Sequence, residues 1–267
     1  MVVRLIEAIL YFEVLGRTRL AVEDRVKRTV DGLKMSPLEI KRLDIGDVIE
    51  DPELDPLSFS ALLEARVEGE LRDLADAVAE YGPTLVEILK PGRIEVPAEG
   101  LSDLLLNLAR KVRELRGGRV VIPIPQNLKE IPVPEVGFDE EELWEAVYQG
   151  RELLYRLSLV LPREMERDTL LKLLLLEGCG VNELKITDLD GVREFSTEAV
   201  SSFESLFAVA FRYSPKTLEI LEPQIVDITA PELQNALSDL GSFVNSILMG
   251  EDLQKAYEKD TFSFKLG

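Results

Sequence analysis

The chain has 267 residues, 46% of them hydrophobic and 30% charged, with a net charge of −19, no histidine and one cysteine. The lack of histidine excludes serine triads, Cys–His dyads and histidine-bearing zinc sites, and a lone cysteine excludes cysteine-rich metal sites and disulfides within one chain. The excess of acid disfavours duplex nucleic acid as a partner, because neutralisation of phosphates by cations supplies most non-specific affinity.

The expected location is the cytoplasm. No apolar run approaches the ~18 residues that a membrane-spanning helix needs. The first residues carry Glu7 and Glu13 inside an apolar stretch and lack a cleavage site, so we expect no signal peptide and no membrane. A lone cysteine fits a reducing compartment. High charge with only five Asn and five Gln favours a thermophilic, archaeal source.

The first half of the chain alternates between two apolar periodicities. Alternation or continuous apolar runs predict strands, and apolar residues three or four apart predict helices. The strands are expected at residues 8–14, 38–49, 59–67 and 84–89, and the helices at 20–33, 70–81 and 101–115.

A connector and a second series of elements follow. Residues 117–137 contain four prolines and predict an extended connector, followed by a bridging helix at Asp139–Leu154 that contains Trp144. In the second half, Thr229 and Glu232 form a capping box before the last helix. The other expected elements are strands at 153–161 and 194–200, a helix at 167–176 and a strand around Leu184–Asp188. A second helix places Phe203, Leu206, Phe207 and Ala210 at the apolar positions of the helix at 70–81.

The two halves repeat one pattern. Residues Tyr81–Val112 align without a gap to Tyr213–Val244 at a constant offset of 132, with 11 identities in 32 positions. Chance would give roughly two identities, because average composition spreads usage over many residue types. The alignment therefore indicates an internal duplication.

The element order of each half predicts its fold. Strand–helix–strand–strand–helix–strand is the split βαβ, or ferredoxin-like, arrangement, to which each copy adds a terminal helix. We therefore predict an α+β chain of two tandem ferredoxin-like domains related by pseudo-twofold symmetry. Its divisions are residues 1–116 for the first copy, 117–151 for the connector and bridging helix, and 152–267 for the second copy with its tail.

One passage resembles a known family. Residues 77–91 read AVAEYGPTLVEILKP and recur in part at residues 212–223. This passage resembles the end of the C-terminal extension of WYL-domain transcriptional regulators. The resemblance implies a ferredoxin-like topology and a sensing or interaction role. It does not imply DNA binding, because the chain has no Trp-Tyr-Leu tripeptide and no basic helix-turn-helix.

Two aligned pairs are candidate ligand-binding residues. Glu87 and Glu219 are the only charged identities in the aligned block. They could hold a divalent cation across a pseudo-twofold axis, or be solvated strand positions kept by common ancestry. Tyr81 and Tyr213 each precede a turn that ends in proline, where the hydroxyl could contact a ligand or the ring could close the core.

A basic cluster is the third candidate. Its members are Arg110, Lys111, Arg113, Arg116 and Arg119. Arg110 and Arg113 could bind a small anionic ligand or the acidic half of a partner chain. Cations at the end of a helix also complement its dipole, which is the alternative reading.

Two further features favour structural roles. Cys179 lies between two glycines with acidic neighbours, which predicts a structural cysteine rather than a reactive thiolate. The helix at 167–176 is apolar nearly all round, which is typical of burial on several sides. We expect this helix to pack either between the copies or between chains, through Leu170, Leu171, Leu174 and Leu175.

The function favoured by the sequence is that of a non-enzymatic binding or interaction protein. It would sense a small molecule or bind a protein partner, including a second copy of itself, at a site between the copies or across a dimer. The alternative is an enzyme that uses carboxylates and a hard metal. RNA binding is a third class, weakened by charge and by 6% aromatic content. No catalytic residue, metal ligand or cofactor is assigned.

Overall fold

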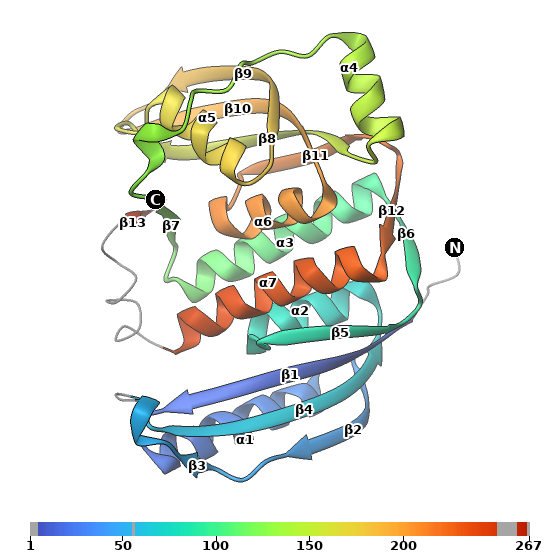
Figure 1. Cartoon of the computed structure of the whole chain (residues 1–267), viewed down its shortest axis with the longest axis vertical. Helices are drawn as coiled ribbons and strands as arrows, with labels where there is room; N and C mark the ends of the chain where they lie inside the picture. Colours follow the sequence, from blue (N-terminus) through green and yellow to red (C-terminus); the bar gives the residue numbers. More distant parts are fainter. Residues whose placement is uncertain (1–4, 55–56, 250–260, 266–267) are drawn as a thin grey trace. The chain divides into compact units, whose positions relative to one another are not determined.

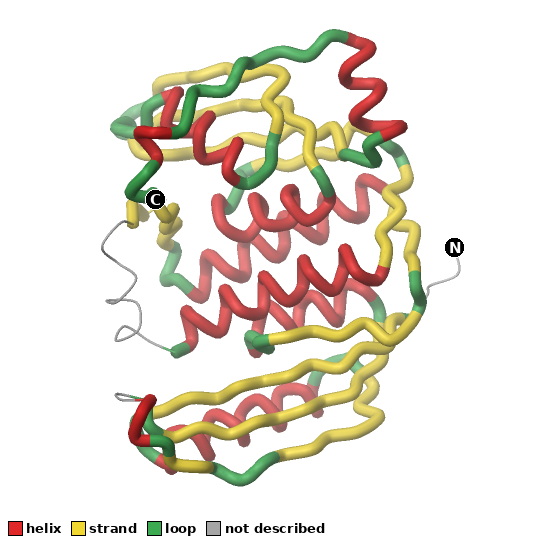
Figure 2. Tube along the Cα trace, viewed as in Figure 1, coloured by secondary structure: helices red, strands yellow, loops and turns green. Residues whose placement is uncertain are grey.

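The computed structural model describes residues 5–54, 57–249 and 261–265, in which helices and antiparallel sheets form two units (Figures 1 and 2). Among the described residues, the first unit contains 5–94 and 229–249, and the second contains 95–228 and 261–265. The chain is therefore of the α+β class. No helix in these ranges combines the length and apolar character that crossing a bilayer requires.

The first unit is built on a sheet with the strand order β2-β4-β1-β5, in which the short β3 also pairs with β4. Its core face follows from alternation: Ala8, Leu10 and Phe12 of β1 are buried, whereas Glu13 is exposed. The elements are β1 (Ile6–Gly16), α1 (Arg19–Met35), β2 (Glu39–Ile45), β3 (Ile49–Glu50), β4 (Phe59–Gly69), α2 (Leu71–Tyr81), β5 (Leu85–Lys90) and α7 (Ala230–Leu248), with a 3-10 turn, η1 (Pro52–Leu54).

The second unit is built on a sheet with the order β11-β8-β10-β9. Its elements are α3 (Ala98–Leu115), β7 (Arg119–Pro123), η2 (Leu128–Glu130), α4 (Glu140–Trp144), the π-helix η3 (Glu145–Gln149), β8 (Leu153–Pro162), α5 (Arg167–Leu176), β9 (Gly180–Asp188), β10 (Val192–Ser201), α6 (Phe203–Tyr213), β11 (Thr217–Glu222) and β13 (Thr261–Lys265). Two-stranded ladders pair β7 with β13, and β6 (Arg93–Pro97) with β12 (Ile225–Thr229).

The two sheets share one strand order. With the short β3 left aside, the first and third strands of each sheet in sequence lie at its centre, and the second and fourth lie at its edges. All ladders of both sheets are antiparallel.

The terminal helices are exchanged between the halves of the sequence. Helix α7, from the second half, packs on β5 and α2, whereas α3, from the first half, packs on β11 and α6. Figure 1 shows this as a mixture of colours, with the orange-red α7 beside the teal β5 and α2, and the green α3 beside the orange α6.

Side chains of the exchanged helices satisfy the outer edges of β5 and β11. The Ile88 N–H donates to Gln234 Oε1 at 3.1 Å, and the Ile220 N–H donates to Ser102 Oγ at 3.0 Å. Ile88 aligns with Ile220 and Ser102 aligns with Gln234, both at the offset of 132. The same edge contact is therefore made twice, each time by a helix from the other half.

Two local predictions can be compared directly with the structure. The capping box at Thr229 and Glu232 is confirmed. The bridging helix is shorter than predicted: it ends at Gln149 rather than Leu154, because Arg151 has a positive φ of 59° and Leu153 already pairs with Ser201 in the sheet. The divisions 1–116, 117–151 and 152–267 describe repeats of the sequence and remain a prediction. The two units of the structure do not follow these divisions, because α7 belongs to the first unit and α3 to the second.

Helix α5 carries the leucines predicted to form an interface. Leu170, Leu171 and Leu174 are buried, whereas Leu175 is 40% exposed. Within the second unit, α5 contacts β9 and the η2 turn, and Lys172 Nζ donates to the Leu128 carbonyl at 3.3 Å. The connector thus covers part of the apolar surface of this helix, and an interface between chains remains a prediction.

We expect Leu174→Ala to lower the free energy of unfolding by about 2–5 kcal/mol, as truncation of a buried leucine does. The matched variant Leu175→Ala should cost about 1 kcal/mol or less, because much of that side chain already contacts solvent. Urea unfolding measures both values. Equal costs would contradict this assignment of faces, and a lower mass by light scattering for Leu175→Ala would show that the helix packs between chains.

Candidate functional site

A cavity of about 460 Å³ lies in the second unit, beside α3 and the turn that joins α6 to β11. Its lining includes apolar side chains from α3, from β8 and from the turn between β9 and β10. The lining residues are Leu106, Ala109, Arg110, Arg113, Val160, Leu189, Ser214, Pro215 and Lys216.

Every ionisable residue in this lining is a cation. Arg113 is half-buried, Arg110 is exposed, and Lys216 Nζ forms an ion pair with Glu194 Oε1 at 3.1 Å. Among the residues that the structure describes, no acid lines the cavity, although the chain carries 50 acidic residues against 31 basic ones. The charge of Lys216 is already paired with that of Glu194, so a bound anion would be attracted chiefly by Arg110 and Arg113. Arginine can also hold a carboxylate or phosphate through two parallel hydrogen bonds.

Ser214 positions the turn at the mouth of the cavity. It ends α6 in the left-handed conformation, with φ of 49°, and its hydroxyl donates to the Ala109 carbonyl at 3.4 Å. The Lys216 N–H donates to the Ser158 carbonyl at 2.8 Å, which fixes the start of β11. The backbone of Lys216 is therefore held by the sheet while its side chain reaches the cavity.

The aligned place in the first unit is closed. The residues aligned with Leu106, Ala109 and Arg110 are Ser238, Gly241 and Ser242. Ser242 Oγ donates to the Thr84 carbonyl at 3.1 Å. A Cβ atom at Gly241 would lie only 2.1 Å from the Pro83 carbonyl oxygen. Small residues thus let α7 touch its turn, whereas larger ones on α3 leave a cavity.

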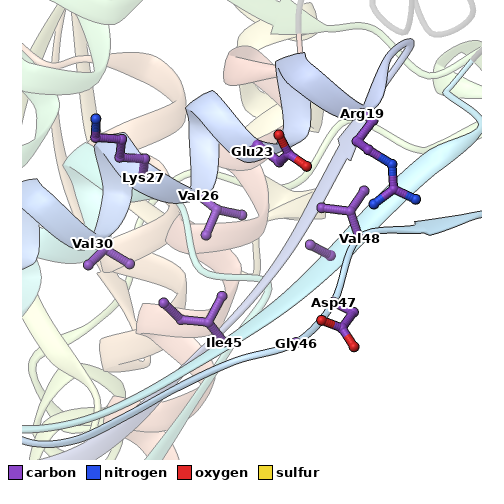
Figure 3. Close-up of a pocket in the computed structure, with 10 residues that line it drawn as sticks. Arg19, Glu23, Val26, Lys27, Val30, Ile45, Gly46, Asp47 and Val48 are labelled. Atoms are coloured by element: carbon purple, nitrogen blue, oxygen red, sulfur yellow. The ribbon is translucent and has the colours of Figure 1, made fainter.

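A second cavity, of about 410 Å³, lies in the first unit between α1 and the turn after β2 (Figure 3). Figure 3 shows Arg19 extending from α1 toward Val48, with Asp47 on the facing turn. Glu23 and Lys27 also line this cavity, so charges of both signs are present and no sign of ligand charge is favoured. None of the residues predicted to bind a ligand lines it.

The predicted tyrosines pack within their own units. The Tyr81 ring lies against Gly32 of α1, where a Cβ atom would meet it at 2.5 Å, and burial raises the pKa of Tyr81 to about 12. Tyr213 is buried and donates to Glu177 Oε1 at 3.4 Å, and burial raises the pKa of Tyr213. Neither tyrosine lines a cavity described above.

The predicted carboxylates lie at aligned positions of β5 and β11. Glu87 accepts a hydrogen bond from the Tyr11 hydroxyl at 3.0 Å, and this contact raises the pKa of Tyr11. Glu219 is exposed and lies opposite Arg156 in the register of β11 and β8. Within the described residues, no group of three or more Asp, Glu, Cys or His side chains is placed to share a metal ion.

Cys179 belongs to a buried polar cluster. Its Sγ accepts from the Tyr155 hydroxyl at 3.2 Å, and the Ser201 hydroxyl donates to Tyr155 Oη at 3.2 Å. Burial raises the pKa of the Cys179 thiol to about 11, so the thiol remains protonated and inert near neutral pH.

Sequence reasoning identified Arg110 and Arg113 but missed Lys216, Ser214 and the apolar walls. Lys216 is one lysine in a turn, and its nearness to α3 depends on which helix packs on β11. The difference between the aligned helices was the signal that could have located the cavity: Leu106 and Arg110 stand where the other copy has Ser238 and Ser242.

The fold and the cavity define an α+β protein with two antiparallel sheets, exchanged terminal helices and a cationic cavity in its second unit. The model of the MJ0538 family matches residues 7–254, and the chain belongs to the MJ0538 family. No curated protein and no solved structure gives a significant match to the chain. The resemblance to WYL-domain regulators receives no support from these comparisons.

The close approach of α7 to its turn can be tested with two glycines. Gly241→Ala should lower the free energy of unfolding by about 1–3 kcal/mol, because the added methyl group meets a backbone oxygen that cannot move alone. Gly100→Ala, the same change in α3 with no atom within 4 Å of the added Cβ, should be neutral or stabilise by up to about 1 kcal/mol. Urea unfolding of both variants checks the sign, and equal effects would contradict the closed arrangement.

Proposed function

We propose that the chain is a non-enzymatic binding protein whose second unit binds a small organic anion in the cavity beside α3. The observation that carries this proposal is the lining of that cavity, where Arg110 and Arg113 are accompanied by no acid among the described residues, and Lys216 pairs with Glu194, which lies outside the lining. Two guanidinium groups that line one cavity attract an anion into it.

The ligand has two chemical parts. Its carboxylate or phosphate pairs with the guanidinium groups, which are suited to planar, two-point recognition. Its apolar part lies against Leu106, Val160 and Leu189, because small-molecule sites are mostly apolar with a few polar groups that fix orientation. The volume of about 460 Å³ fits a small metabolite rather than a polymer.

The proposal includes the origin of the cavity in a duplication of a ferredoxin-like domain. The shared strand order of the two sheets and the aligned edge contacts of Ile88 and Ile220 support a common ancestor. One copy then kept small residues on its terminal helix, and the other acquired Leu106, Arg110 and Arg113. The pseudo-twofold relation of the copies, and a further site between them or across a dimer, remain predictions.

An enzyme that uses carboxylates and a hard metal remains the alternative. Glu87 bonds to a tyrosine hydroxyl and Glu219 faces solvent on its strand. Two carboxylates supply fewer oxygens than the six or more that calcium takes. The cationic cavity is therefore better supported than a carboxylate site.

Isothermal titration with phenyl phosphate, benzoate, inorganic phosphate and the neutral benzyl alcohol tests the proposal. We expect phenyl phosphate or benzoate to bind and benzyl alcohol not to bind. Arg113→Gln should weaken binding by about tenfold or more, which corresponds to the loss of one hydrogen bond to a charged group. Thermal stability should rise with ligand concentration in the parent chain, since the ligand binds only the folded state.

The matched control is Arg119→Gln, which removes a cation of the same basic cluster that does not line the cavity. This variant should bind the anions as the parent does. Equal weakening by Arg113→Gln and Arg119→Gln would indicate non-specific attraction, and an absence of binding by all four probes would refute the proposed function.

A further inference from the structure

The connector presents an exposed pair of aromatic rings. Trp144 and Tyr148 have ring centroids 5.8 Å apart and are 54% and 55% exposed. They belong to one short helical segment, α4 followed by the π-helix η3, which Figure 1 draws in yellow-green. Trp144 is the chain's single tryptophan.

This helical segment is attached to the unit by its other side. Val147 is buried and Leu143 is half-buried, so they hold the helix while the two rings remain in solvent. Single exposed apolar residues are common on proteins, but two large rings in contact leave a continuous apolar surface in water. Trp and Tyr are also the residues enriched at the energetic centres of protein interfaces.

Acidic side chains surround the rings. Glu141 and Glu145 are exposed on the same short helical segment as the rings, and Glu141 lies one α-helical turn before both Trp144 and Glu145. Tyr148 Oη donates to Glu222 Oε2 at 3.3 Å, which places a third carboxylate beside the pair. The face therefore combines π surfaces with negative charge, and both attract a cation.

The backbone of this segment is also unusual. Residues Glu145–Gln149 form a π-helix, in which the Gly150 N–H donates to the Glu145 carbonyl at 2.8 Å. Single π turns are rare and occur frequently at functional sites. Here the π turn lies within the ring-bearing stretch and includes Tyr148.

We propose that this face, formed by Glu141, Trp144, Glu145, Tyr148 and Glu222, binds an arginine-bearing segment of a partner protein. A guanidinium is planar, so it can stack flat on an aromatic ring and pair with a carboxylate through two parallel hydrogen bonds. A compact ammonium group has neither of these geometries. The rings are inclined by 36° and more than half exposed, so they form an open platform rather than a closed cage for a small quaternary ammonium ion. This interaction is independent of the anion cavity.

The test uses the intact chain, whose tryptophan emission reports on this face alone. The probes are the capped peptides Gly-Arg-Gly-Arg-Gly and Gly-Lys-Gly-Lys-Gly, and tetramethylammonium. The arginine peptide should change Trp144 emission in a saturable manner and bind about fivefold or more tightly than the lysine peptide, as stacking of the guanidinium requires. Light scattering of the free chain in the same buffer should show no concentration-dependent self-association through this face.

Two double variants with equal charge changes and one aromatic variant complete the experiment. Glu141→Gln/Glu145→Gln should weaken binding of the arginine peptide about fivefold or more, as should Tyr148→Ala. Glu164→Gln/Glu166→Gln, which neutralises two exposed acids before α5, should leave binding unchanged. Equal binding of the two peptides, equal loss in the two double variants, tighter binding of tetramethylammonium, or unchanged emission would each overturn the proposal.

Discussion

The edge strands of the two sheets depend on helices that arrive from far along the chain. A strand at the edge of a sheet carries a row of N–H and C=O groups that need partners. In the first unit, Val86 N–H donates to Ser238 Oγ at 3.0 Å and Ile88 N–H donates to Gln234, so α7 supplies what a further strand would supply. Ser102 does the same for Ile220 in the second unit. This side-chain-to-edge contact brings each terminal helix onto its sheet.

The cavity follows from the same contact. The bond from Ser102 to the edge strand fixes the rotation of α3 about its axis. The side chains at 106, 109, 110 and 113 therefore face the loop between α6 and β11. On α7 the aligned residues are Ser238, Gly241, Ser242 and Asn245, and the helix touches its turn at Gly241. On α3 the same positions hold a leucine, an alanine and two arginines. The same helix placement therefore leaves a cavity in the second unit and a closed contact at the aligned place in the first.

The sequence predicted most elements because their periodicities are strong, as in the buried alternation of β1 and the capping box at Thr229. It could not predict which sheet each terminal helix covers. Leu101, Leu105 and Leu108 align with Leu233, Leu237 and Leu240, so both helices present the same apolar stripe and this stripe does not distinguish one sheet from the other. Arg110 and Arg113 were visible as a dense basic cluster, whereas the contribution of Lys216 depends on a contact across more than 100 residues.

The exchange of helices also links folding to the order of synthesis. Ile88 and Gln234 are 146 positions apart, and loop closure over such a separation comes late and slowly. The sheet of the first unit therefore waits for α7, which is translated well after its strands, whereas α3 is translated before the strands of the second sheet. During that interval the outer edge of β5 stays unpaired, which is the kind of surface that chaperones and neighbouring nascent chains recognise.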